Sequence, residues 1–369
     1  MNDMMSIIFA SDNETKLNDL TLHRTTASLP FCGRYRFIDF TLSNLVNSGI
    51  TTIGIMTRSN YSSLMDHIRM GRDWDLNRKN SGIAVFPPYA SNTSRNFKGK
   101  VEALYGILDY MEWAQEEYIV LTNSNVALNI DFEDVRAKHL EKGADITMLT
   151  YQSKPKDSRR LLVETDETGR VIDSRITHMS DDNVHETGLN IYFLKKDLCM
   201  KLVADCYEHG GVDWEKNIIQ QKQNDLRICT YRVPGHAAII DDIQSYFTES
   251  MRILNTEVRN DLFYRFGKVF TKVKDSMPTI YRHGAQVKNS LIADGCIING
   301  TVENSILFRG VTVEEGAIIR NSIVMENGKV CKNSQLNYVI TDKEVTITDG
   351  KTISGFETYP LVIVKNKTI

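Results

Sequence analysis

The sequence has no long apolar run, no closely paired cysteines and no strong excess of charge. None of its 369 residues lies in a stretch approaching the ~20 apolar residues that a membrane-spanning helix needs, and the N-terminus lacks the layout of a signal peptide. Its six cysteines are scattered without a CxxC pair, which favours reduced thiols over a structural metal site. A net charge of −3 argues against nucleic acid or an anionic membrane as a partner. We therefore expect a cytoplasmic protein that uses neither.

Two different hydrophobic periods divide the chain. Strand and helix patterns alternate from Met5 to about Leu254, which predicts a doubly wound α/β domain with a mostly parallel sheet. From Gln286 to about Gly355, apolar β-branched residues recur at roughly every fifth or sixth position, the signature of a parallel β-helix. Asn-Ser followed by Leu or Ile returns at positions 289, 304 and 321 within this region.

These periods predict an α/β domain over residues 1–251, a linker over 252–285 and a β-helix over 286–369. The linker carries aromatic residues at positions 263, 264, 266 and 270. It could therefore be a packed strap between the domains instead of a free connection, because such side chains are costly to leave in water.

The most specific stretch runs from Leu29 to Ile50 and reads LPFCGRYRFIDFTLSNLVNSGI. Apolar positions from Ile38 onward have helical spacing, and Asn47-Ser48-Gly49 supplies a stop. The stretch resembles PFGGKYRIIDFxLSNxxNSGI, the pattern of the sugar-nucleotide pyrophosphorylases that make ADP-glucose from glucose 1-phosphate and ATP. The resemblance extends, more thinly, along nearly the whole chain. It implies a Rossmann-like nucleotidyltransferase domain followed by a left-handed parallel β-helix.

The phosphate-binding loop of that family departs strongly from its pattern here. The family has roughly GGxGxRLxPLT after the first strand, whereas this chain has SDNETKLNDLT from Ser11 to Thr21. Every glycine is missing, although glycine lets the backbone approach a phosphate closely. Asp12 and Glu14 would also bring carboxylates toward a polyphosphate. Lys16 stands at the family's arginine and is a remnant of the substrate site.

The two metal-binding aspartates of the family are also replaced. The GDH motif corresponds to Asn123-Ser124-Asn125, which puts Asn125 at the first aspartate, and the WxDVGTxxxYW motif puts Ile239 at the second. A magnesium ion needs anionic oxygen ligands, so the resemblance implies no metal site here. A shifted register could supply a carboxylate from Asp241 or Asp242.

The family's two phosphate-binding lysines are replaced by threonines. RAKPAVP corresponds to a segment with Thr26 at the lysine, and FxEKP to one with Thr177 at the lysine. Gly99, Asp213 and Lys216 keep the family residue in two other motifs, GTADA and DFGKDIIP. With Lys16, they predict a substrate pocket retained in outline.

His23 and Arg24 form a basic corner that the family links to phosphorylated effectors, so we take them as candidate anion ligands, with an ordinary surface pair as the alternative. The losses affect independent catalytic positions while the core pattern is intact.

The resemblance therefore implies a non-catalytic D-type subunit of bacterial glycogen synthesis, without a cofactor. It would form a hetero-oligomer, expected to be a tetramer, with a catalytic ADP-glucose pyrophosphorylase subunit, and a sugar phosphate could act as effector. Two alternatives are a weakly active, magnesium-dependent glucose-1-phosphate adenylyltransferase and a sensor of ADP-glucose or a sugar phosphate.

Overall fold

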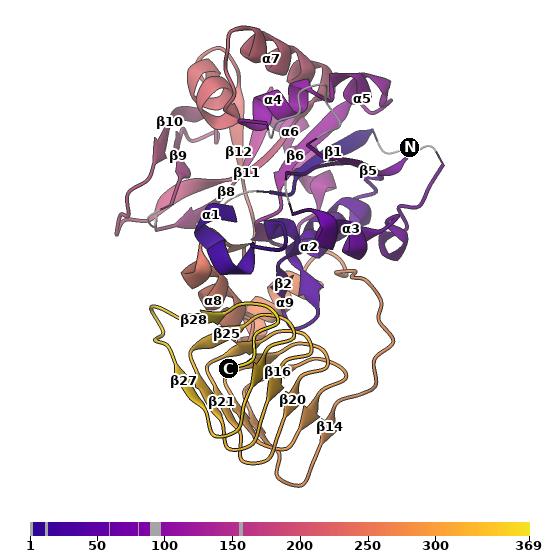
Figure 1. Cartoon of the computed structure of the whole chain (residues 1–369). Helices are drawn as coiled ribbons and strands as arrows, with labels where there is room; N and C mark the ends of the chain where they lie inside the picture. The colour runs from indigo at the N-terminus through magenta and orange to yellow at the C-terminus, as the bar shows by residue number, and fades with distance from the viewer. Residues whose placement is uncertain (1–2, 12–13, 59, 80, 89–96, 155–157) are drawn as a thin grey trace.

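The computed structural model describes residues 3–11, 14–58, 60–79, 81–88, 97–154 and 158–369. An α/β domain and a C-terminal β-helix stack on each other, and the connection between them runs along one side (Figure 1). The predicted fold class is confirmed. Within the described ranges, no helix is both long and apolar enough to cross a membrane.

The α/β domain is built on a nine-stranded mixed sheet. Its main path is β10-β9-β11-β6-β1-β4-β5, and β8 joins β11 to β12. The run β6-β1-β4-β5 and the pair β8–β12 are parallel, whereas β11 is antiparallel to β6 and β8. The bounds are β1 (Met4–Phe9), β4 (Thr52–Met56), β5 (Gly82–Phe86), β6 (Tyr118–Asn123), β8 (Ile146–Ser153), β9 (Arg160–Thr165), β10 (Val171–Thr177), β11 (His185–Lys195) and β12 (Ile228–Arg232).

Helices cover both faces of this sheet. One apolar cluster joins it to α2 (Phe37–Asn47), α3 (Ser62–Ile68) and α6 (Phe132–Lys142). The other joins it to α4 (Lys100–Tyr105), α5 (Leu108–Trp113) and α7 (Lys196–Glu208). Helix α2 is the helix predicted within the specific stretch. It begins where Asp39 accepts a hydrogen bond from the Arg36 amide (2.9 Å), and it is followed by Gly49 with φ +74°, a conformation that glycine adopts at little cost.

The β-helix consists of three parallel five-stranded sheets. The first contains β14 (Ile280–Tyr281), β17 (Ile297–Ile298), β20 (Thr312–Val313), β23 (Lys329–Val330) and β26 (Thr346–Ile347). The second contains β15 (Gln286–Lys288), β18 (Thr301–Glu303), β21 (Ile318–Arg320), β24 (Gln335–Asn337) and β27 (Thr352–Ser354). The third contains β16 (Leu291–Ile292), β19 (Ile306–Leu307), β22 (Ile323–Val324), β25 (Val339–Thr341) and β28 (Leu361–Ile363).

The repeated Asn-Ser pairs form one corner of successive coils. Asn289, Asn304 and Asn321 have φ of 44–45°, in the left-handed region that asparagine tolerates better than most residues. The hydroxyl of Ser305 accepts the amide of Ser322 at 3.1 Å. Each corner therefore supplies a hydrogen bond to the next coil, which explains the repeat seen in the sequence.

The connection between the domains differs from the predicted linker. It contains α9 (Thr256–Tyr264), directly after α8 (Ile243–Arg252), and β14 already belongs to the β-helix because it pairs with β17. The prediction placed the start of the β-helix too late because both β14 residues are exposed, so the buried apolar period is missing there. Phe263 packs against Tyr35 and Phe40, with ring centroids 5.0 and 5.4 Å apart, as expected for a strap.

The two domains share an apolar core and a buried ion pair. The shared core combines aromatic residues of the specific stretch with α8 and with one column of the β-helix, Ile306, Ile323 and Ile340. Beside it, one terminal nitrogen of the Arg24 guanidinium, Nη2, donates to both oxygens of the Asp342 carboxylate, at 2.8 and 2.9 Å. The side chains of this pair are only 3% and 2% exposed.

We predict that Asp342→Ala destabilises the protein by about 3–5 kcal/mol, because it leaves the Arg24 charge buried without a partner. Urea unfolding of the full chain measures this change. Replacing both partners, as Arg24→Met with Asp342→Leu, should recover much of the loss. Glu141→Ala, which removes an exposed partner of Lys138, should have no measurable effect. Equal stability of Asp342→Ala and the wild type would contradict the prediction.

Candidate functional site

The two positions that correspond to the family's metal ligands lie side by side. A small antiparallel ladder joins β7 (Val126–Ala127) to β13 (Ala238–Ile239). At its end, the Asn125 side-chain amide donates to the Ile240 carbonyl at 3.1 Å, and the Ile240 amide donates to the Asn125 carbonyl at 2.9 Å. Asn125 and Ile239 both line a cavity of about 80 Å³. The other lining residues are Lys100, Asn123, Val126, Arg159, Arg160, Gly188, Leu189, Asn190 and Asp241.

The donor atoms at this cavity do not fit a magnesium ion. The side-chain oxygens of Asn123 and Asn125 are buried and have no hydrogen-bond partner among the described residues, but both are neutral. Ile239 offers no ligand atom. Because Mg²⁺ is usually held through carboxylates and keeps several waters, two amide oxygens do not replace the lost pair of aspartates.

Asp241 does bring a carboxylate to the cavity, but a cation of the same chain is already bound to it. The Arg160 guanidinium contacts its carboxylate, and the Ser158 hydroxyl donates to it at 3.2 Å. Burial raises the pKa of Asp241, while Arg160 opposes that rise. Asp242 instead caps α8 by accepting the Ser245 amide at 2.7 Å. The shifted register thus supplies one carboxylate, and Arg160 neutralises it.

The remaining cations of the cavity are paired in the same way. The Lys100 amine lies 2.6 Å from a Glu215 oxygen, and Arg159 contacts both Glu215 (3.3 Å) and Asp213 (2.7 Å). Burial alone would raise the pKa of Glu215, but Lys100 and then Arg159 outweigh it and hold this pKa at about 2. Lys100, Arg159 and Arg160 therefore face carboxylates of the chain itself where a phosphorylated substrate would need them free.

The other positions singled out in the sequence do not line this cavity. Gly99 begins α4, where a Cβ atom would lie 2.1 Å from the Val212 carbonyl oxygen, so only glycine fits. Lys216 and Lys16 are exposed. Thr26 is buried in a turn, and Thr177 ends β10.

The structure describes only part of the segment that corresponds to the family's phosphate-binding loop. Asp12 lies outside the described residues, and Glu14 is described only through the backbone of α1 (Glu14–Leu17). The neighbouring Ser11 hydroxyl accepts the Arg58 amide at 3.3 Å.

Arg24, predicted as an anion ligand, is buried and paired with Asp342, so an anion would have to displace that carboxylate. The anion site stays a prediction. His23, its partner in that prediction, is exposed. No local pattern reveals this pair, since Arg24 and Asp342 are 318 residues apart.

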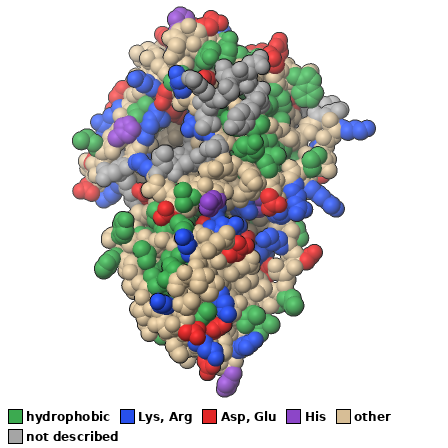
Figure 2. Space-filling model, viewed as in Figure 1, with side chains coloured by type: hydrophobic (Ala, Val, Ile, Leu, Met, Phe, Trp, Pro, Cys, Tyr) green, Lys and Arg blue, Asp and Glu red, His purple; other side chains and the backbone are tan. Residues whose placement is uncertain are grey.

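A basic pocket of about 110 Å³ lies nearby, where the α/β domain meets the β-helix. Six cationic side chains and only two carboxylates line it: Arg34, Arg36, Lys272, Lys274, Arg309, Lys343, Asp66 and Glu326, together with His67. Figure 2 shows Lys and Arg side chains, with a few carboxylates between them, gathered on the viewed face where the domains meet. We refer to this site as the basic pocket.

Burial, together with neighbouring cations, lowers two pKa values in the basic pocket. Burial, and then the Arg36 guanidinium, lower the pKa of Lys343 to about 8, although Glu326 lies only 2.8 Å away. Burial also lowers the pKa of Arg36. An anion bound here would relieve this repulsion.

Sequence reasoning missed both sets of charges. The cavity ion pairs and the basic pocket combine side chains from distant segments, which no local motif reveals. One usable signal was the spacing of 17 residues between Glu326 and Lys343, because residues one coil apart stack in a β-helix.

Comparisons with known proteins agree with the two-domain fold. Residues 5–178 match the nucleotidyl transferase family, and residues 277–358 match the GlmU-like C-terminal hexapeptide family. The chain is 34% identical to the glycogen biosynthesis protein GlgD of Bacillus subtilis (strain 168), over 99% of this chain and 96% of that protein. It is 35% identical to GlgD of Geobacillus stearothermophilus, over 86% and 83%. Identity to the glucose-1-phosphate adenylyltransferase of Bacillus mycoides (strain KBAB4) is 30%, over 95% and 94%.

The low pKa of Glu215 predicts a loss of stability in acid. Because its pKa of about 2 lies below the ordinary 4.5, ionised Glu215 contributes about 3 kcal/mol above pH 4.5, and this contribution disappears as the pH falls toward 2. Glu215→Gln should therefore be less stable than wild type at pH 7, with a difference that shrinks below pH 4.5.

Urea unfolding between pH 3 and 7 measures this difference, with the exposed Glu112→Gln as a control that should follow the wild type. A difference between Glu215→Gln and wild type that stays constant with pH would contradict the assignment.

Proposed function

The chain belongs to the ADP-glucose pyrophosphorylase (glucose-1-phosphate adenylyltransferase) family and resembles its GlgD members, and from that premise we propose that it is a non-catalytic regulatory subunit. The names of its relatives support a role in glycogen biosynthesis. In this proposal, the chain binds a catalytic subunit of the same family and shifts that subunit between conformations of different activity.

The observation that carries the proposal is that cations and carboxylates of the chain pair with each other at the cavity lined by Asn125 and Ile239. Adenylyl transfer needs free cations and a divalent metal to stabilise the charge of the reacting phosphates. Here Arg160 is bound by Asp241, and Lys100 by Glu215. A phosphorylated substrate would have to break these ion pairs before it could bind. The ion pairs therefore support the proposal that the chain does not turn over substrate.

The two alternative functions are less well supported. A weakly active enzyme would require a metal that Asn125 and Ile239 do not hold. A sensor of ADP-glucose would have to use the adjoining pocket of about 590 Å³, which shares Arg160, Ile239 and Asp241 with the cavity. The cavity itself holds only about 80 Å³, whereas drug-sized ligands occupy pockets of roughly 300–1,000 Å³.

An exposed apolar stretch between α9 and the β-helix supports a protein partner. Tyr264, Val273 and Met277 are 76%, 71% and 75% exposed, and Ile280 and Tyr281 follow at about half exposure. Apolar side chains that gather at the surface mark interaction sites. We assign this stretch to contacts within a hetero-oligomer, a tetramer in the simplest arrangement.

The first test separates regulation from catalysis. The isolated chain should form no ADP-glucose from Mg-ATP and glucose 1-phosphate, whereas adding it to the catalytic subunit should change the kcat of that subunit or its response to effectors severalfold.

The control is a complex in which the active site of the catalytic subunit has been inactivated, and it should also be silent. Product from that complex would establish the weakly active enzyme, and an unchanged catalytic subunit would overturn the regulatory proposal.

We further propose that the basic pocket binds a phosphorylated effector. Since the pKa of Lys343 is about 8, affinity for a phosphate should fall as the pH rises through 8 and the free amine loses its proton. Calorimetry with a hexose phosphate and with inorganic phosphate at pH 7 and 9 measures this loss.

Lys343→Arg should keep its affinity at pH 9 because arginine stays charged, Lys343→Gln should bind weakly at both values, and Lys201→Gln, a change of an exposed lysine on α7, should behave as wild type. Equal affinity of Lys343→Gln and wild type would refute this site.

A further inference from the structure

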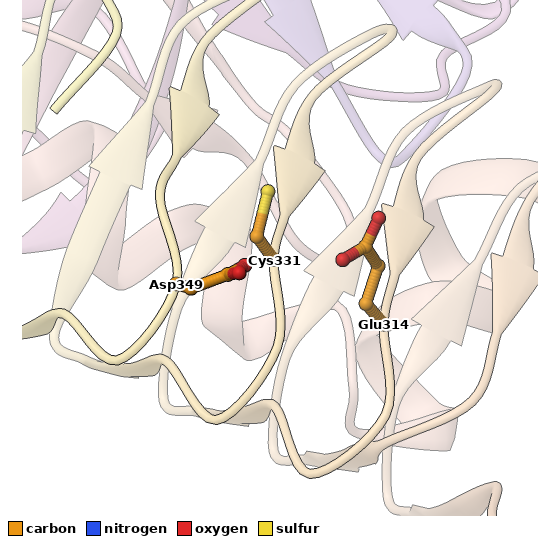
Figure 3. Close-up of side chains that lie close together, drawn as sticks. All are labelled: Glu314, Cys331 and Asp349. Atoms are coloured by element: carbon orange, nitrogen blue, oxygen red, sulfur yellow. The ribbon is translucent and has the colours of Figure 1, made fainter.

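One face of the β-helix gathers a thiol and two carboxylates from three successive coils. Glu314 follows β20, Cys331 follows β23 and Asp349 follows β26 (Figure 3). The coils are joined by backbone hydrogen bonds from Glu314 to Val330 (2.9 Å) and from Cys331 to Ile347 (3.0 Å). The β-helix itself therefore holds these three potential metal ligands close together. None of them belongs to the cavity described above.

The geometry is close to that of a metal site. The donor atoms of Glu314, Cys331 and Asp349 all lie within 4.8 Å of one another. Three atoms with that separation share a centre no more than about 2.8 Å from each, whereas zinc binds sulfur at about 2.3 Å and carboxylate oxygen at about 2.0–2.2 Å. Movements of about 0.5–0.8 Å per atom would close the site.

The thiol is the observation that distinguishes this cluster from ordinary surface acids. Cys331 is only 8% exposed, and its sulfur has no hydrogen-bond partner within the described part of the chain. Burial and then the Glu314 carboxylate raise the pKa of this thiol, because a second negative charge is unfavourable beside the first.

We propose that Glu314, Cys331 and Asp349 form a site for a borderline divalent transition metal such as Zn²⁺, which would link three coils of the β-helix. A thiolate with two carboxylates suits zinc better than magnesium or calcium, which prefer oxygen ligands only. On binding, the Cys331 thiol releases its proton to solvent and its sulfur bonds to the metal. A solvent molecule completes the four ligands. The site is independent of the regulatory proposal.

The Lys329 amine would compete with a metal ion for the Glu314 carboxylate. Its amine lies 2.9 Å from a Glu314 oxygen, so a metal ion must displace it or use the other oxygen. Asp349 accepts the Lys332 amide through one oxygen, at 3.1 Å, and has its second oxygen to offer. Removing the Lys329 amine should therefore strengthen metal binding. If the cluster served only as an ion pair, this substitution would produce no such gain.

Titration of the full-length, chelator-treated and reduced protein with Co²⁺ tests the site. Cobalt bound to a thiolate gives a near-ultraviolet charge-transfer band, which we expect in the wild type and not in Cys331→Ser. Asp349→Asn should weaken apparent Co²⁺ affinity by about tenfold or more, since even the loss of an outer-shell partner commonly costs 10–100-fold. Lys329→Met should bind more tightly than wild type.

Cys296→Ser is the matched control, because Cys296 is also buried in the β-helix but donates to the Phe308 carbonyl. This variant should keep the band. Asp349 is exposed, so its variant tests the site even if Cys331→Ser folds poorly. Absence of a thiolate band in the wild type, or its survival in Cys331→Ser, would overturn the proposal.

Discussion

A charge that is removed from water needs an opposite charge close by, and this requirement organises much of the molecule. At the edge of the sheet, Arg160 faces Asp241, and Lys100 faces Glu215. Between the domains, Arg24 faces Asp342. In an active nucleotidyltransferase, part of this pairing would come from a metal ion and a polyphosphate. Here the chain supplies both partners of each of these pairs.

The basic pocket is the exception to this balance. Its cations outnumber its carboxylates, and its surroundings lower the pKa of Lys343 to about 8. It is built from both domains, so an anion bound there would stabilise their relative arrangement. If a partner subunit contacts both domains, its binding would depend on how the domains are arranged. Anion binding and subunit binding would then be coupled.

Periodic features of this chain could be predicted from the sequence, whereas long-range pairings could not. The apolar residues of helix α2 and the Asn-Ser corners of the β-helix recur at fixed intervals. Such a pattern can be recognised in the sequence and predicts the local structure. The adjacency of Asn125 and Ile239 followed from motif register, not from any local physical signal. Arg160 and Asp241 are 81 residues apart, and no local pattern links them. The start of the β-helix was missed because the side chains of β14 face solvent.

The shared core between the domains changes how the β-helix should unfold. A repeat structure contacts mainly its neighbouring repeats, so it can open coil by coil from an end. Here Ile306, Ile323 and Ile340, from three consecutive coils, are packed into the same core as α8. Leu291 and Val362, from the first and last strands of the same sheet, also pack against this core. This whole face of the stack is thereby tied to the α/β domain, and we expect the two domains to lose their structure together, as one cooperative unit.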